Sequence, residues 1–96
     1  MNPFPDVQTE ASHGRVQAAE MLAIAAITHI AANEALLGRF IDLSGISIPQ
    51  LKAGLDKAPV QRAALDFLAN HEPDLIACAE SMDVTPAQLI SARDRL

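Results

Sequence analysis

Hydrophobic residues recur at three- and four-residue steps along most of the chain, the spacing of helices that present one face to a core. In the stretch Gly14–Ala32 they include Val16, Ala19 and Ala23, and no proline interrupts them. From Met21 on, this stretch is apolar nearly all round, so we expect it to lie centrally or at a partner surface. No segment alternates with a period of two, so the sequence predicts an all-α fold.

Further helices are predicted over residues 34–43, 48–57, 59–69, 72–82 and 86–96. Asn33 is placed to cap the start of the first of these, and Gly45 supplies the left-handed residue that often ends a helix. Residues 1–12 contain two prolines and no periodicity, so we expect a flexible N-terminal tail followed by one helical domain over residues 13–96. The prediction is a small bundle of five to six short helices.

An internal repeat with a period of about 38 residues divides the predicted helices into two related three-helix units. Under this shift, residues 25–27 (Ala-Ala-Ile) align with residues 63–65 (Ala-Ala-Leu), and residues 50–51 align with residues 88–89 (both Gln-Leu). The alternative is that Ala-rich helical sequences align by chance.

Matching helix starts favour a true repeat. Ser47 with Gln50, and Thr85 with Gln88, both have the spacing of a capping box, in which each side chain bonds the backbone of the other residue. The flanking apolar pairs, Ile46 with Leu51 and Val84 with Leu89, have the spacing of a hydrophobic staple.

Composition narrows the function classes. The chain of 96 residues is 50% hydrophobic but only 3% aromatic, so the core must be built from aliphatic side chains and Ala. Its net charge of -5 argues against nonspecific nucleic-acid binding and against binding to anionic membranes.

The most apolar stretch, Met21–Ala32, is shorter than the roughly 20 residues that span a bilayer. The single cysteine, Cys78, forms no internal disulfide, and we expect a cytoplasmic protein.

No motif for catalysis, metal binding or cofactor binding emerges, so we predict no enzyme activity, metal or cofactor. His71 and Cys78 are seven residues apart and could share a helix face, but a buried structural cysteine is the favoured interpretation. The turn around Gly45 resembles that of a helix-turn-helix motif, and the repeat offers a second copy. The basic residues are few: Lys52 in the first copy, and Arg93 and Arg95 in the second.

Four residues stand out as candidates for an interaction surface: Arg39, Phe40, Asp42 and Phe67. Arg39 lies in an apolar helix with Asp42 three residues on, at the spacing of a same-face pair. A salt bridge that holds this helix to a neighbour is favoured over a partner-binding role. Phe40 and Phe67 are two of only three aromatic residues, the side chains that usually anchor binding hot spots.

The run Leu36–Ile46 (LLGRFIDLSGI), with residues 63–68 (AALDFL) and the Thr85-Pro86 helix start, resembles a family of small alphaproteobacterial proteins, domain of unknown function 3572. The resemblance covers residues from about Arg15 to Arg95. It departs from the family pattern at Asn33-Glu34, where Asp-Pro is usual, and over residues 74–79, where the family is richer in leucine. It implies an all-α cytoplasmic bacterial protein with no assigned reaction.

We therefore expect an uncharacterised, non-catalytic protein-interaction or adaptor module with a protein partner, which a second copy of the chain could supply as a homodimer. A helix-turn-helix nucleic-acid-binding or regulatory protein is the first alternative, disfavoured by the few basic groups. An enzyme with an unrecognised site is the second. Membrane association is not expected.

Overall fold

The computed structural model describes the backbone of residues 4–96 and the side chains from Gly14 on, apart from Arg15. Six helices follow one another: α1 (Phe4–Ala31), α2 (Glu34–Ser44), α3 (Ile48–Ala53), α4 (Ala58–Ala69), α5 (Glu72–Ser81) and α6 (Pro86–Asp94). The described residues contain no strand, which confirms the predicted small all-α bundle.

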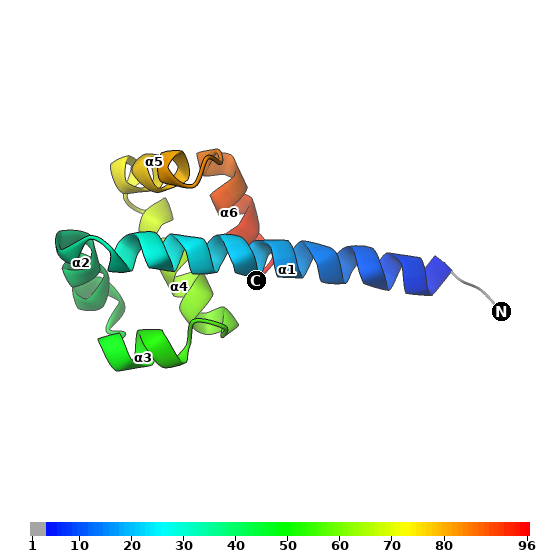
Figure 1. The fold of residues 1–96 in the computed structure, drawn as a ribbon, viewed down its shortest axis with the longest axis horizontal. Coiled ribbons are helices and arrows are strands. Elements are labelled where there is room, and N and C mark those ends of the chain that lie inside the picture. Colours follow the sequence, from blue (N-terminus) through cyan, green and yellow to red (C-terminus); the bar gives the residue numbers. More distant parts are fainter. Residues whose placement is uncertain (1–3) are drawn as a thin grey trace.

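Helix α1 and helix α4 cross at the centre of the fold (Figure 1). Helix α1 packs against α2, α4, α5 and α6, and α4 also contacts α2, α5 and α6. Figure 1 shows α2 and α3 following the end of α1, and α5 and α6 lying on the other side of it from α3. Helices α1 and α4 thus form the centre of the fold, and α2, α5 and α6 pack against both.

Helix α1 begins at Phe4, further toward the N-terminus than the predicted start at Gly14. Most of the segment predicted as a tail therefore belongs to this helix in the structure. The division into a tail over residues 1–12 and a domain over residues 13–96 stays a prediction.

The helix boundaries follow the predicted period. Helices α2 and α5 begin at Glu34 and Glu72, 38 residues apart, and α3 and α6 begin at residues 48 and 86, again 38 apart. Helices α1 and α4 end at Ala31 and Ala69, which keeps the same 38-residue spacing. An evolutionary duplication remains a prediction, but the two units share the end of the first helix and the starts of the second and third.

The two turns that carry the repeat use the same backbone device. Gly45 has φ of +74° and Asp83, 38 residues on, has φ of +56°. Aspartate is one of the few side chains that enter the left-handed region readily, which explains how it replaces glycine there. Both predicted capping boxes are confirmed, with Ser47 and Thr85 as the N-cap residues.

The core consists mainly of small and aliphatic residues, as composition requires. Helix α1 contributes Ala19, Ala23 and Ala26 with no exposed surface, and Ile27 and Ile30 are almost as deeply buried. Alanine faces let helix backbones approach closely, so the sparse aromatic content does not prevent a continuous core.

Helix α3 ends four residues before the predicted end at Lys57. The amide of Gly54 closes the helix on the carbonyl of Gln50 at 2.9 Å, and Lys57 is instead the residue before α4. The buried side chain of Gln61 holds this turn, since its Nε2 donates to the carbonyl of Leu55 at 2.8 Å. Sequence periodicity does not reveal such a tertiary contact.

Candidate functional site

The two aromatic candidates, Phe40 on α2 and Phe67 on α4, meet inside the core. Their ring centroids are 5.3 Å apart and the rings are nearly perpendicular, at 73°, an edge-to-face arrangement that favours both rings. Phe40 has no exposed surface, so a partner cannot touch it in this conformation. Phe67 is buried too, but it borders a cavity.

The two charged candidates have different surroundings. Arg39 forms its ion pair with Asp74 of α5, with Nη2 and Oδ2 at 2.8 Å, and not with Asp42. Arg39 thus uses the favoured salt bridge from this helix to a neighbouring helix, and not the ion pair with Asp42 that the three-residue spacing allowed. Asp42 is exposed on α2. An interaction role for Arg39, Phe40, Asp42 and Phe67 stays a prediction.

Cys78 and His71 have separate surroundings. Cys78 is fully buried, its Sγ lies 3.6 Å from Sδ of Met82, and burial raises the pKa of the thiol to about 11. His71 Nδ1 lies 3.0 Å from the carbonyl oxygen of Phe67, and because a carbonyl only accepts, this nitrogen is the donor. The expected structural role of the cysteine is supported, and among the described residues no group of three His, Cys, Asp or Glu side chains could hold a metal ion.

His29 links α1 to α5. Its Nδ1 lies 3.1 Å from Oγ of Ser81, and the Ser81 hydroxyl donates its proton to the carbonyl of Cys78 at 2.7 Å. Because a hydroxyl has one proton to donate, Nδ1 of His29 must be the donor in this pair. The contact explains a histidine within an apolar helix by packing and hydrogen bonding alone.

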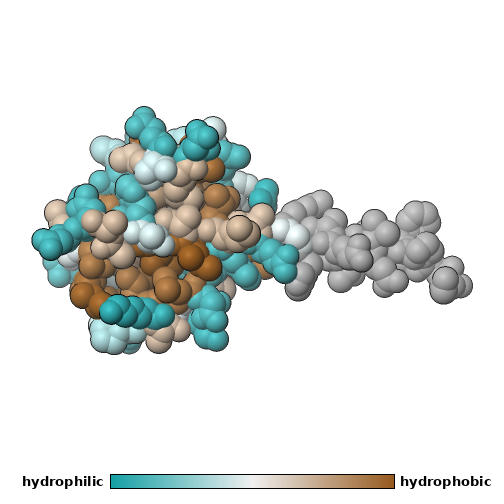
Figure 2. Space-filling view, viewed as in Figure 1, coloured by the Kyte–Doolittle hydropathy of each residue, from teal (hydrophilic) through white to brown (hydrophobic). Residues whose placement is uncertain are grey.

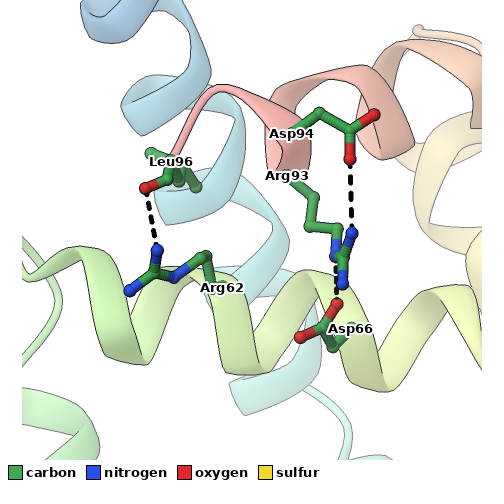
Figure 3. A network of polar contacts seen from close by, with 5 residues as sticks. All are labelled: Arg62, Asp66, Arg93, Asp94 and Leu96. Atoms are coloured by element: carbon green, nitrogen blue, oxygen red, sulfur yellow. Dashed lines mark hydrogen bonds and ion pairs between the residues drawn. The ribbon is translucent and has the colours of Figure 1, made fainter.

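Of the three basic residues in the helix-turn-helix interpretation, Arg93 is engaged in ion pairs within the chain. Arg93 of α6 pairs through Nε with Asp66 of α4 and through Nη1 with Asp94 at 3.3 Å, as Figure 3 shows. These carboxylates raise the pKa of the Arg93 guanidinium further above its usual value. Arg62 donates to the carbonyl of Leu96 at 3.1 Å, so the two arginines join α4 to the C-terminal segment (Figure 3). In the first copy of the helix-turn-helix motif the recognition helix would be α3, which has six residues and carries Lys52 as its basic group.

A cavity of about 440 Å³ lies where the C-terminal ends of α2 and α4 meet. We call it the α2–α4 cavity. Its lining comprises residues from α2, from α4 and from the start of α5: Leu43, Ser44, Ala63, Asp66, Phe67, Asn70 and His71. The α4 members follow the three- and four-residue steps of one helix face. That face mixes apolar and polar residues, so an apolar pattern alone could not identify it as a site.

Several lining groups are already oriented by hydrogen bonds. Ser44 Oγ accepts from the amide of Ile46 at 3.1 Å, and the ring of His71 stacks in a tilted arrangement beside Phe67, with centroids 5.2 Å apart. Asp66 uses Oδ1 for Arg93, and in Figure 3 its second carboxylate oxygen points away from that arginine. Asp66 is the one Asp, Glu, Lys or Arg among the lining residues.

A second hollow, of about 630 Å³, lies between α1 and the end of α5. We call it the α1–α5 groove. Four of its lining residues come from one face of α1, and the rest come from α5 and the residue after it: Ala18, Met21, Leu22, Ala25, Ser81 and Met82. None of these six side chains is charged. Met21 is 72% exposed, the largest exposed fraction among the large hydrophobic residues whose side chains are described.

Further apolar surface lies elsewhere on the molecule. Figure 2 shows apolar residues gathered where α1, α2 and α3 border one another. The exposed aliphatic side chains include Leu43 at the end of α2, at 65%, Ile48 at the start of α3, at 44%, and Leu55 in the following turn, at 37%. Of these three side chains, Leu43 also lines the α2–α4 cavity. Apolar atoms make up much of any protein surface, so we take as candidate sites two places where apolar residues line a concave surface.

In the part of the chain that the structure describes, no single helix is long and apolar enough to cross a membrane. The helical segments Val16–Ala31 and Glu34–Ser44 meet the length and composition criteria only when they are taken together. The chain bends by 113° between them.

Comparison with known proteins adds a family but no described activity. No curated protein and no solved structure matches the chain significantly. The sequence profile of one family, described as protein of unknown function (DUF3572), matches residues 16–96, which include α2 to α6, both turns of the repeat and both hollows. This chain belongs to the DUF3572 family.

Proposed function

We propose that this protein is a non-catalytic interaction module that receives an aliphatic helix of a protein partner in the α1–α5 groove. The observation that carries the proposal is Met21, which is 72% exposed at the edge of an uncharged groove of about 630 Å³. A flexible, polarisable methionine adapts to the shape of an apolar partner.

The spacing of the groove residues suits a helix. Ala18, Met21, Leu22 and Ala25 follow the three- and four-residue steps of one α1 face. The two alanines let a partner backbone approach, and Met21 and Leu22 provide the side chains that insert between partner residues. This is how an amphipathic helix binds an apolar groove.

A non-catalytic role is favoured by the state of the one thiol. The buried Cys78, with a pKa of about 11, is a poor nucleophile at neutral pH. A single cysteine also suits a reducing compartment, so we propose a cytoplasmic location.

Site-specific photocrosslinking in the source cells tests the interaction. A benzophenone amino acid replaces Met21 in one variant and Ala87 in the matched control, since Ala87 of α6 is exposed but does not line the groove. We expect a discrete crosslinked product at position 21 and none of the same mass at position 87. A product of twice the chain mass identifies a second copy, and another mass identifies a different partner. Equal, diffuse labelling at both positions contradicts the proposal.

Binding of the crosslinked partner is then measured with the purified chain. Burying a methionine side chain contributes about 1.5–3 kcal/mol, so Met21→Glu should weaken binding by at least about tenfold. Ile90→Glu is the matched control, since Ile90 is an exposed aliphatic residue of α6 outside the groove. Equal weakening by both substitutions would mean that the groove is not the binding surface.

A further inference from the structure

We infer that the α2–α4 cavity is a binding site for an organic cation, a primary ammonium or guanidinium group on an apolar stem. This site goes beyond the proposed function, because its lining shares no residue with the α1–α5 groove.

The size and the apolar part of the lining suit a small ligand. Ligand pockets usually enclose about 300–1,000 Å³, and this cavity encloses about 440 Å³. Leu43, Ala63 and the Phe67 ring provide apolar surface for a stem of several carbons. Phe67 is held by its edge-to-face contact with Phe40, so this wall is formed before a ligand arrives.

The C-terminal ends of two helices add partial negative charge to the edge of the cavity. Leu43 and Ser44 are the last residues of α2, and Asn70 follows the last residue of α4. A helix carries a partial negative charge at its C-terminus, where the final carbonyls have no donor within the helix. Two such ends meet here, against one N-terminus with partial positive charge, that of α5, whose N-cap is the lining residue His71. The balance of the helix ends therefore favours a cation.

The polar side chains add acceptors for a cation. Asp66 engages Arg93 through Oδ1, which leaves Oδ2 for a ligand, and Arg93 itself does not line the cavity. His71 donates from Nδ1 to the Phe67 carbonyl, so the lone pair of the neutral ring is on Nε2. The lining contains no Lys or Arg. The Asp66 carboxylate and the His71 imidazole nitrogen thus form an acceptor pair with no Lys or Arg side chain in the lining.

Titration of the full chain with three ligands of one shape tests the charge selectivity. n-Pentylammonium, n-pentanol and n-pentanoate are added at constant ionic strength, and the backbone amide signals are followed by two-dimensional NMR. We expect pentylammonium to shift signals of the lining residues and to bind about tenfold more tightly than pentanol, since a hydrogen bond to a charged group contributes about 1.5 kcal/mol or more. Equal binding of the alcohol, or tighter binding of the carboxylate, overturns the inference.

Two substitutions that break the Asp66–Arg93 ion pair show whether the charge of Asp66 or the structural role of the pair affects binding. Asp66→Asn removes the carboxylate and should weaken pentylammonium about fivefold, whereas Arg93→Gln frees the carboxylate and should tighten it. A purely structural role of the pair would change binding in the same direction in both variants. Ala63→Leu should abolish binding by filling the cavity, with Ala87→Leu on the exposed face of α6 as its matched control.

Capped tripeptides identify the source of the cation. Acetyl-Gly-Arg-Gly-amide and its lysine counterpart carry the cation as a protein does, and acetyl-Gly-norleucine-Gly-amide is the uncharged control. Binding of the basic peptides but not of the control indicates a partner's basic side chain, and binding of free amines alone indicates a small molecule. Binding of the norleucine peptide at equal strength would show that charge is not recognised and would overturn the inference.

Discussion

The closest packing in the turn between α3 and α4 gives a sharp prediction for Gly54. A Cβ added to Gly54 would collide with Cγ2 of Val60, and would also lie 3.0 Å from the carbonyl oxygen of Gln50 and 3.2 Å from Cβ of Val60. Valine is restricted to essentially one rotamer in a helix, so its methyl group cannot turn aside. Gly54→Ala must therefore shift the start of α4 relative to α3.

The expected magnitude combines two opposing effects. Inserting a methyl group into a filled space lowers the free energy of unfolding by about 1–3 kcal/mol. Replacing glycine by alanine restricts the unfolded chain, which raises the free energy of unfolding by about 0.4–1 kcal/mol. Gly54 has φ of -105°, which alanine adopts freely, so no backbone strain adds to this. We expect Gly54→Ala to lower the free energy of unfolding by about 1–2 kcal/mol, and Tm by about 4–16 °C.

Gly38 provides the matched control. It lies in α2, and a Cβ built there meets no atom within 4 Å. Gly38→Ala should therefore raise the free energy of unfolding by about 0.5–1 kcal/mol, the ordinary gain of alanine over glycine within a helix.

Urea unfolding followed by far-ultraviolet circular dichroism measures both variants, and the double variant Gly54→Ala/Val60→Ala tests the mechanism. Removing the two methyl groups of Val60 should make the added Cβ tolerable, so the double variant should be more stable than the two separate losses predict. If Gly54→Ala is as stable as the parent protein, or if Val60→Ala brings no relief, the packing argument is refuted.

Three further predictions concern caps, the thiol and a salt bridge. Ser47→Ala and Thr85→Ala should each lower the free energy of unfolding by about 1 kcal/mol in urea denaturation, because each hydroxyl caps a helix start, and no loss at either site would contradict that role. The folded-state pKa of Cys78 is raised from 9.0 to about 11, so the folded state retains the thiol proton longer than the unfolded state does, and the stability this provides is complete below pH 9 and is lost as the pH rises toward 11. Urea denaturation across that range should show a steeper decline for the parent protein than for Cys78→Ala, and parallel curves would refute the argument. Arg39→Ala should cost less than about 1 kcal/mol in the same assay, since both side chains of the Arg39–Asp74 pair are partly exposed, and a larger loss would show that Arg39 has a packing role beyond this pair.

Local signals in the sequence were sufficient for the six helices and, to within one residue, for the starts of α2 to α6, but not for the start of α1 at Phe4. Helical periodicity, Asn33, Gly45 and the two capping boxes act through residues within a few positions of one another, so their outcome does not depend on the rest of the fold. For the same reason the 38-residue repeat could be recognised from aligned caps, and it reappears in the helix boundaries. The left-handed conformation of Asp83 belongs to that local pattern.

Tertiary structure decided which side chains meet. Arg39 could reach Asp42 by helical spacing, but the packing of α2 against α4, and of α4 against α5, brings Asp74 to it. Phe40 and Phe67, 27 residues apart in the chain, contact each other only because α2 and α4 pack together. The α2–α4 cavity likewise depends on how two helix ends and the start of a third come together. Contacts within a turn are specified by sequence spacing, whereas contacts between helices depend on crossing geometry and on the volume of every side chain between them.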